Sequence, residues 1–313
     1  MAEVATREVY GRTLVELGRE RPDLVVLDAD LSPSTMTIYF AEAFPQRHFD
    51  CGIAEQNMVS IAAGLAASGK VVFASTFAVF AAPKAYDQMR IHLAQPGLNV
   101  KVVATHGGVT VGEDGFSHQA VEDLALATSL PGFTVIVPAD GPETEQAVRA
   151  AARLPGPFYI RLGRPKTPVI HGEGYRFEVG RAEVLRKGGD VAIIACGVLV
   201  SQALAAAEAL AREGVGCRVV NIATIKPLDE AAVEAAARET GAMVVCEEHL
   251  EQGALGSAVA RALARRYPVP VEFVSIRDCY GTSGPGEALL ERYGLTGPHI
   301  AQAALRAIGR KRA

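Results

Sequence analysis

The sequence predicts an α/β protein of two domains, each built as a sheet with helices on both faces. Three observations carry this prediction. Short apolar runs alternate with helical patterns along the whole chain, which is the order expected of parallel strands joined by helices. A single Pro/Gly-rich stretch, GRPKTPVIHGEG (163–174), interrupts the alternation. The length of 313 residues is sufficient for two domains of ordinary size.

The first domain is predicted from apolar runs of strand length that each lead into polar residues. These runs are DLVVLDAD (23–30), GKVVFAST (69–76), LNVKVVATH (98–106), FTVIVPAD (133–140) and FYI (158–160). The clearest helix, IAEQNMVSIAAGLAASG (53–69), has apolar residues at helical spacing and a glycine at its end. A parallel sheet covered by helices is the expected result.

The second domain repeats this pattern after residues 163–174, which we interpret as an interdomain linker. Its predicted strands are DVAIIACG (190–197), GCRVVNIA (216–223), AMVVCEEH (242–249) and VEFVSIRD (271–278). Ala-rich segments with high helix propensity separate them. We therefore place the first domain at residues 1–172 and the second at residues 173–313.

Composition excludes several classes of protein. With 49% hydrophobic and 21% charged residues, the chain is not expected to be disordered. A net charge of −4 argues against nucleic acid as a partner. We find no apolar run long enough for a membrane span and no signal-peptide core at the N-terminus. The five cysteines form no C-x-x-C pair, so we expect reduced thiols in a cytoplasmic protein.

The most informative segment is HGGVTVGEDGFSHQ (106–119), which directly follows a predicted strand. In open α/β sheets, ligands bind at the carboxyl ends of the strands. Glycines allow close approach of the backbone to a ligand, and histidine and aspartate offer proton transfer near neutral pH. A metal site is a weaker alternative, because the two histidines are not at a known ligand spacing. A polar surface loop remains the simplest alternative.

Two other motifs also have a functional and a structural interpretation. In CGIAEQN (51–57), Glu55 falls in the first turn of an apolar helix, where the helix dipole alone favours a carboxylate. In STFAVF (75–80), Phe77 and Phe80 are suited to form a flat wall for an aromatic ring. An isolated pair of phenylalanines is more often part of a core.

Taken together, the motifs resemble the ordered series of the transketolase C-terminal half. The matching segments are GIAEQN, STFAVF, THGGVTVGEDGFSHQ, PAD and RLGRPK, and LDADLSPST (27–35) resembles the ADLxPS loop of that family. The resemblance extends over nearly the whole chain. It implies a thiamine-diphosphate pyrimidine-binding domain followed by a transketolase C-terminal domain.

The resemblance also implies roles for cofactor-side residues. Glu55 matches the glutamate that hydrogen-bonds N1′ of the cofactor's aminopyrimidine and favours its reactive imino form. Phe77 and Phe80 match the aromatic residues around that ring, whereas a third aromatic position is Pro83 here. Asp30 matches a loop acid on the cofactor side of the subunit contact.

On the substrate side, the resemblance implies that Asp114 recognises a sugar hydroxyl and that His118 lies near the reacting carbon. With Glu55, these are the expected catalytic residues. Four further positions match the residues that hold the sugar phosphate, for which cationic groups and a hydroxyl are suited. They are His106, Arg161, Arg7 and Ser34.

One element of the family is missing. We find no GDG…N motif, which in thiamine-diphosphate enzymes holds the metal and the diphosphate, and GEDG (112–115) is not such a motif. We therefore expect no metal ligand in this chain. A separate N-terminal subunit should supply the Mg²⁺ or Ca²⁺ site, and the two subunits should assemble at least to a heterotetramer.

The expected function is that of the C-terminal subunit of a two-subunit transketolase. Such an enzyme transfers a two-carbon ketol unit between ketose and aldose phosphates, as in the pentose phosphate pathway. Alternatives within the superfamily are half of a deoxyxylulose-phosphate synthase, a transketolase for a rarer sugar phosphate, and the β subunit of a 2-oxoacid dehydrogenase. A non-catalytic assembly protein that kept the fold is an alternative of another class.

Overall fold

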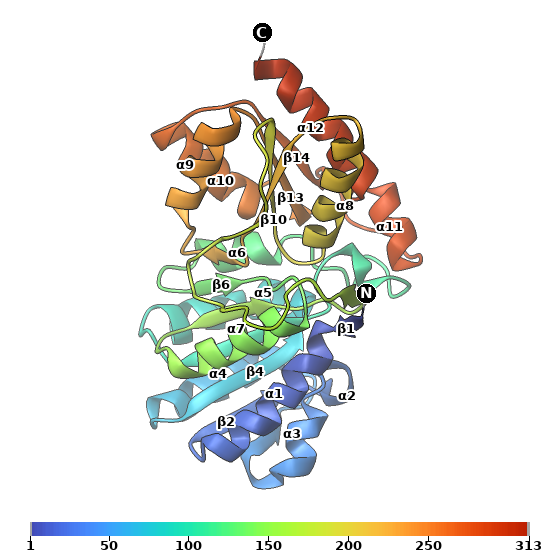
Figure 1. The fold of residues 1–313 in the computed structure, drawn as a ribbon. Coiled ribbons are helices and arrows are strands. Elements are labelled where there is room, and N and C mark those ends of the chain that lie inside the picture. Colours follow the sequence, from blue (N-terminus) through green and yellow to red (C-terminus); the bar gives the residue numbers. More distant parts are fainter. Residues whose placement is uncertain (1, 312–313) are drawn as a thin grey trace.

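A computed structural model describes residues 2–311 and shows two α/β domains arranged one above the other (Figure 1). This arrangement confirms the predicted fold class. In the part of the chain that the structure describes, no helix combines the length and the apolar character needed to span a membrane.

The first domain contains a seven-stranded sheet in the order β12-β6-β7-β5-β4-β2-β3. All neighbouring strands are parallel except β12, which is antiparallel to β6. The strands are β2 (Leu24–Asp28), β3 (His48–Asp50), β4 (Val71–Phe77), β5 (Val100–Thr105), β6 (Thr134–Ile136), β7 (Phe158–Arg161) and β12 (Thr224–Lys226). The five strands predicted from apolar runs are all present.

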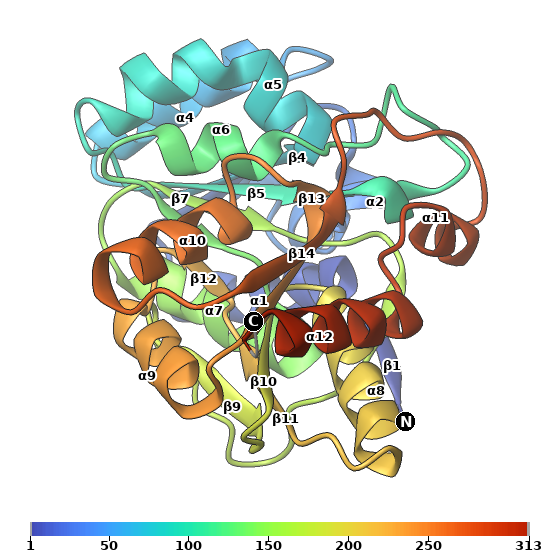
Figure 2. The same cartoon turned by 90° about the horizontal axis from the view of Figure 1, so that it is seen from above.

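Helices cover both faces of this sheet, because successive side chains of each buried strand point to opposite faces. Val25 and Leu27 belong to the core under α4, α5 and α6, whereas Leu24 and Val26 belong to the core under α1, α3 and α7. The helices are α1 (Thr6–Glu20), α2 (Ser32–Thr35), α3 (Ile38–Ala43), α4 (Glu55–Ala67), α5 (Ala78–Gln88), α6 (Asp123–Ser129) and α7 (Gly141–Arg153). A π-helical segment, η2 (Met89–Ala94), continues α5, and Figure 2 shows α4, α5 and α6 on one side of the sheet.

The second domain has a five-stranded sheet in the order β14-β13-β10-β11-β9, in which only β9 is antiparallel. The strands are β9 (Glu183–Arg186), β10 (Val191–Ala195), β11 (Cys217–Asn221), β13 (Met243–Leu250) and β14 (Val271–Ile276). Helices α8 (Leu199–Arg212) and α12 (Gly297–Lys311) cover one face, and α9 (Glu230–Thr240) and α10 (Leu255–Arg266) cover the other (Figure 1). Helix α11 (Gly286–Arg292) lies beyond the end of β14.

Two strand pairings were not predicted, and one of them ties the domains together. Strand β12 belongs to the second half of the sequence but extends the first sheet by pairing with β6. The expected linker also contains a strand, β8 (Lys166–Pro168), which pairs antiparallel with β1 (Glu3–Ala5). The segment between the domains is therefore a structured connection and not a free tether.

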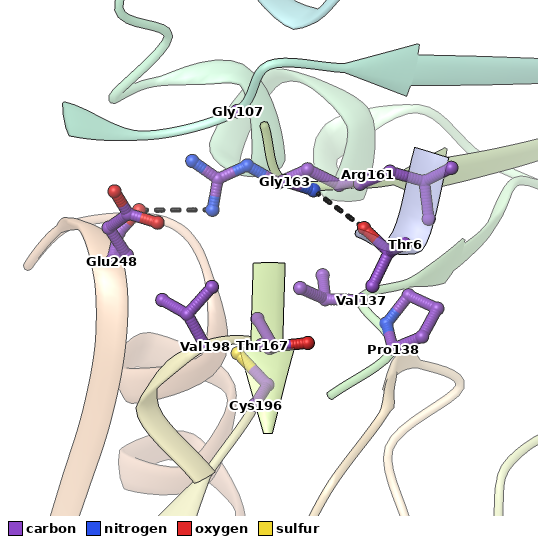
Figure 3. A pocket seen from close by; sticks show the side chains of 12 residues that line it. Thr6, Gly107, Val137, Pro138, Arg161, Gly163, Thr167, Cys196, Val198 and Glu248 are labelled. Carbon is purple, nitrogen blue, oxygen red and sulfur yellow. Dashed lines mark hydrogen bonds between the residues drawn. The ribbon is translucent and has the colours of Figure 1, made fainter. Parts of the chain in front are cut away.

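Charged groups are also buried where the domains meet. Arg161, at the end of β7, is 4% exposed and donates from Nη1 to the carbonyl of Glu248 on β13 at 3.0 Å (Figure 3). Its Nε lies 3.2 Å from the fully buried carboxylate of Asp123. A buried charge is tolerated only when it is paired and hydrogen-bonded, so these contacts fix the two domains in one arrangement.

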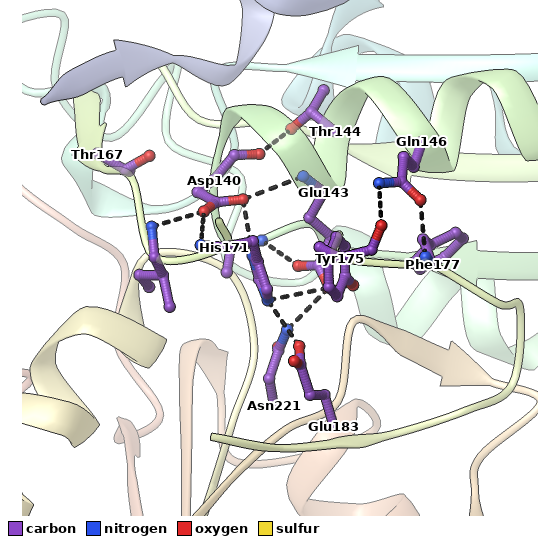
Figure 4. A network of polar contacts seen from close by, with 12 residues as sticks. Asp140, Glu143, Thr144, Gln146, Thr167, His171, Tyr175, Phe177, Glu183 and Asn221 are labelled. Atoms are coloured by element: carbon purple, nitrogen blue, oxygen red, sulfur yellow. Dashed lines mark hydrogen bonds and ion pairs between the residues drawn. The ribbon is translucent and has the colours of Figure 1, made fainter. Parts of the chain in front are cut away.

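A second buried network surrounds His171 of the connecting segment (Figure 4). His171 Nδ1 lies 2.9 Å from Asp140 Oδ1, and Nε2 lies 2.9 Å from Glu183 Oε2 and 4.0 Å from Glu143 Oε1. The ring of Tyr175 packs against the imidazole at a tilt of 32°, with the ring centres 4.0 Å apart, and its hydroxyl donates to Glu143. Asp140 caps helix α7, while Glu183 opens strand β9, so His171 joins the two domains.

Burial alone would lower the pKa of His171, but the hydrogen bond to Asp140 and the charges of Glu143 and Asp140 outweigh it and raise the pKa. A histidine whose pKa is raised by folding stabilises the protein fully below its unfolded pKa of about 6.5. This stabilisation is lost as the pH rises through the higher pKa of the folded state.

We predict that His171→Gln destabilises the chain by about 3 kcal/mol at pH 6, as expected when one partner of a buried ionic network is removed. The difference from the wild type should shrink steadily as the pH is raised to 9. Urea unfolding of both proteins at several pH values measures it. A difference that stays constant across this range would contradict a charged His171.

Candidate active site

The carboxyl ends of neighbouring parallel strands bring most of the predicted site residues to one edge of the first sheet. Strands β4, β5 and β7 end at Phe77, Thr105 and Arg161. Their register pairs Phe77 with Thr105 and Ala104 with Arg161. The loops that follow these strands therefore leave the sheet side by side.

An aromatic wall stands at this edge. The rings of Phe77, the last residue of β4, and Phe80, in the first turn of α5, have centres 5.9 Å apart and are inclined by only 12°. His106 stacks on Phe77 at 3.9 Å, and His118 presents an edge to Phe80 at 5.5 Å. Two roughly parallel phenyl rings bordered by two imidazoles form a surface suited to a flat heterocycle.

Glu55 lies beside this wall at the start of α4 and is only 2% exposed. Its Oε2 forms an ion pair with Lys84 Nζ, which also lies 5.7 Å from the centre of the Phe80 ring. Among the described residues, Oε2 has no aligned hydrogen bond. A buried carboxylate next to an aromatic surface, paired with a partly exposed lysine, is a natural partner for a ring nitrogen.

His106 adopts a left-handed backbone conformation (φ +57°), which is uncommon for a residue with a side chain. It is 3% exposed, and its Nδ1 lies 2.9 Å from Thr105 Oγ1. Burial, reinforced by the charges of Arg7 and Arg164, lowers the pKa of His106 to about 3. With its pKa lowered in this way, His106 offers a neutral imidazole at this position.

The glycine-rich loop 106–119 exposes its two acidic side chains and leaves His118 half-buried, whereas His106 at its start is buried. Gly108 and Gly112 have φ of +82° and +90°, so a side chain at either position would strain the turn. Asp114 is 42% exposed, and the half-buried His118 lies within 3.0 Å of Ser117 Oγ through Nδ1. Both predicted catalytic side chains of this loop are thus reachable from outside.

Cationic side chains gather next to this loop. Arg7, in the first turn of α1, donates from Nη1 to the carbonyl of Ser34 at 2.8 Å. Its Nε reaches the carbonyl of Arg164 at 3.4 Å. Arg164 Nη1 donates to Val111 and lies 3.5 Å from Asp114 Oδ2. Arg164 was not predicted as a site residue, yet it sits between the loop and Arg7.

The prediction that Arg161 holds a substrate phosphate is wrong. Its guanidinium is buried and directed to Asp123 and to the carbonyls of Ala120 and Glu248. The cavity beside it has a volume of about 20 Å³, which is room for about one water molecule. Arg164, three residues further on in the same RLGRPK motif, is the cation that reaches the open site.

The two acids of the LDAD motif have different surroundings. Asp30 is exposed and has φ +61°. Asp28 is fully buried and accepts 2.6 Å hydrogen bonds from the N–H of Leu31 and the hydroxyl of Thr35. Burial raises the pKa of Asp28 to about 6. Asp28 thus supports the loop that carries Asp30 and Ser34, although only the outer acid was predicted as functional.

Comparison with known proteins places the chain in a family. Residues 2–169 match the family described as "Transketolase, pyrimidine binding domain", and residues 180–300 match "Transketolase, C-terminal domain". The chain belongs to the transketolase family. The predicted boundary at residue 172 falls in the short segment between these two matches.

Three transketolase relatives show how far the similarity extends. A protein of Methanocaldococcus jannaschii, named as a transketolase C-terminal section, is 45% identical over 95% of this chain and 94% of its own length. A 6-deoxy-6-sulfo-D-fructose transketolase subunit of Clostridium sp. (strain MSTE9) is 41% identical over 97% and 95%. A solved split-gene transketolase, an inactive beta4 tetramer, is 51% identical with a TM-score of 0.92, covering 99% of this chain and all of that one.

Transketolases use thiamine diphosphate, and the residues of this chain fit the pyrimidine half of that cofactor. The parallel rings of Phe77 and Phe80 offer a face for the heterocycle, and Glu55 offers a buried acceptor beside it. Within residues 2–311, no three or more His, Cys, Asp or Glu side chains are grouped as they would be around a metal ion.

Proposed function

We propose that this chain is the C-terminal subunit of a two-subunit transketolase and carries the pyrimidine half of its thiamine-diphosphate site. The observation that carries the proposal is that buried Glu55 lies beside the Phe77–Phe80 wall, which His118 of the glycine-rich loop also contacts. If the loop were only a polar surface loop, and Glu55 only a carboxylate that suits the helix dipole, these groups would have no reason to lie together.

In this proposal, each side chain acts at a stated atom. When bound, the cofactor supplies a carbon nucleophile for the substrate carbonyl. Glu55 holds a proton at N1′ of the pyrimidine, while Phe77 and Phe80 fix the plane of the ring and exclude water from it. His118 exchanges protons with substrate oxygens near the reacting carbon, and Asp114 accepts a hydrogen bond from a sugar hydroxyl.

Two cationic side chains at the mouth of the site, Arg7 and Arg164, are proposed to hold the sugar phosphate. Burial lowers the pKa of Arg7, and the charge of nearby Arg164 lowers it further. A phosphate between them would relieve the repulsion and accept paired hydrogen bonds. The hydroxyl of Ser34 and the neutral imidazole of His106 would complete its surroundings.

The rest of the site is proposed to come from a separate N-terminal subunit that binds the diphosphate and Mg²⁺ or Ca²⁺. The relative from M. jannaschii, named as a C-terminal section, and the inactive split-gene tetramer support this division. Exposed apolar side chains near Glu55 also suit a partner surface, with Ile53 77% and Phe49 42% exposed. We propose a cytoplasmic heterotetramer that acts in the pentose phosphate pathway.

A second substrate class is suggested by the relative that acts as a 6-deoxy-6-sulfo-D-fructose transketolase subunit. A sulfonate carries one negative charge fewer than a phosphate dianion and makes similar hydrogen bonds. Because Arg7 and Arg164 suit either anion, a sulfosugar is the main alternative donor, and a panel containing both classes of sugar distinguishes them.

The phosphate assignment predicts that Arg164→Ala raises KM for phosphorylated donors by about 10- to 100-fold, since a lost charge-assisted hydrogen bond costs about 1.5–3 kcal/mol. The KM for hydroxypyruvate, which has no phosphate, should change little. Steady-state kinetics of the reconstituted complex measure both values. Equal losses with both donors would show that Arg164 does not contact the phosphate. Arg161→Ala is the matched contrast: because this guanidinium does not reach the open site, the variant should not raise KM selectively for phosphorylated donors.

The proposed division of the site predicts that the chain alone binds thiamine diphosphate weakly and does not turn over ketose phosphates. Adding the N-terminal subunit should restore tight, Mg²⁺-dependent binding and activity in an assembly of at least two copies of each chain. Titration calorimetry and a mass measurement in solution follow both changes. An active one-to-one heterodimer, or tight binding by the chain alone, would contradict this division.

The role of Glu55 predicts that Glu55→Gln nearly abolishes turnover with every sugar, while leaving the fold and most cofactor affinity intact. The physical reason is that a neutral amide no longer favours the protonated N1′ on which activation of the cofactor depends. The direct measurement is exchange of the C2 hydrogen of bound cofactor for deuterium without substrate. Exchange at the wild-type rate in a cofactor-saturated variant would reduce Glu55 to a helix-start carboxylate.

A further inference from the structure

None of the proposed catalytic residues belongs to the second domain. The second domain nevertheless holds in place the loop 106–119, which carries Asp114 and His118. Glu248 on β13 is 5% exposed, and its Oε1 accepts a hydrogen bond from the N–H of Thr110 at 2.6 Å. Its carboxylate also fills the space next to Gly108, where any side chain would overlap it. One carboxylate of the second domain thus determines the path of the backbone just after His106.

Arg161 also holds this segment in place. Its Nη1 donates to the carbonyl of Glu248, and its Nη2 donates to the carbonyl of Ala120, each at 3.0 Å. The guanidinium lies against Gly107, where a side chain would also overlap it. Because the cation and Glu248 are both buried, the start and the end of the loop 106–119 are held against one strand of the second domain.

The far part of the loop is held by the segment between β14 and α11. Gln119 is 1% exposed, and its Nε2 donates to the carbonyl of Thr282 at 2.9 Å. Ser283 donates its hydroxyl to the carbonyl of Glu113 at 2.7 Å. These contacts lie next to Asp114 and His118, so the second domain contacts the loop on both sides of the proposed catalytic side chains.

We infer that the second domain positions the catalytic loop, and that Glu248 is the positioning residue through which it does so. This inference rests on the proposed function for its kinetic consequences, but the geometry it describes is independent of that function. Without the Glu248 acceptor, the N–H of Thr110 is left buried and unpaired, and the strained turn at His106 loses its support. His106 and His118 then leave the aromatic wall.

The neighbouring residue provides a matched control. Glu247 is 1% exposed, but its carboxylate faces the opposite side of β13 and accepts hydrogen bonds from the N–H groups of Leu255 and Gly256, at the start of α10. Glu247→Ala and Glu248→Ala therefore each remove a buried carboxylate from the same strand. Only Glu248 touches the loop.

The first measurement uses the full chain alone, labelled at its histidine rings and observed by NMR. Glu248→Ala should shift the imidazole signals of His106 and His118, whereas Glu247→Ala should leave both unchanged. Glu248→Gln, which keeps an acceptor for Thr110, should restore signals near the wild-type positions. If Glu248→Ala lowers only the unfolding temperature and leaves these signals in place, the inference is overturned.

The second measurement uses the complex with the N-terminal subunit. Glu248→Ala should lower kcat about tenfold or more with both phosphorylated and unphosphorylated donors and change KM less, because the catalytic side chains are displaced. Equal losses in Glu247→Ala would overturn the inference. If Glu248→Ala does not fold, Ser283→Ala removes an exposed contact to the same loop and should shift His118. If the wild-type complex is inactive, that result counts against the proposed function only. The NMR measurement on the chain alone still tests whether Glu248 positions the loop.

Discussion

The buried guanidinium of Arg161 is the constraint on which much of the arrangement depends. An unpaired cation inside a protein is very unfavourable, and Arg161 is accommodated because Asp123 and two backbone carbonyls surround it. One of those carbonyls belongs to β13 of the second domain. The first domain therefore buries this charge only when the second domain is docked, and the glycines at 107 and 108 are required by the closeness of that docking.

The main elements of the fold could be predicted because buried parallel strands appear in a sequence as continuous apolar runs. The runs around Val25, Val72 and Val102 are all strands in the structure. Strands β1, β8 and β12 have only three residues each and therefore show no pattern that distinguishes them from a loop. The stretch 163–174 has the composition of a linker, but β8 and the contacts of His171 depend on distant partners that composition does not reveal.

The site, like the fold, could be predicted only in part. The resemblance located the loops correctly at the carboxyl edge of the sheet, and Glu55 and the two phenylalanines meet there. It did not separate Arg161 from Arg164, because both lie in RLGRPK and their difference is one of burial alone. The neutral state of His106 could not be predicted from the sequence either, because it results from burial and from cations that lie far away in the chain.

The pairing of β12 with β6 has a consequence for what counts as a folding unit. A fragment that ended in the connecting segment would contain every helix of the first domain but would lack the outermost strand of its sheet. The backbone N–H and C=O groups along that side of β6 would then have no partner, and an unpaired edge of this kind is a template for pairing with another molecule. Strand β12 thus protects the edge of β6 from pairing with another molecule. A fragment without β12 is expected to aggregate unless another strand covers that edge.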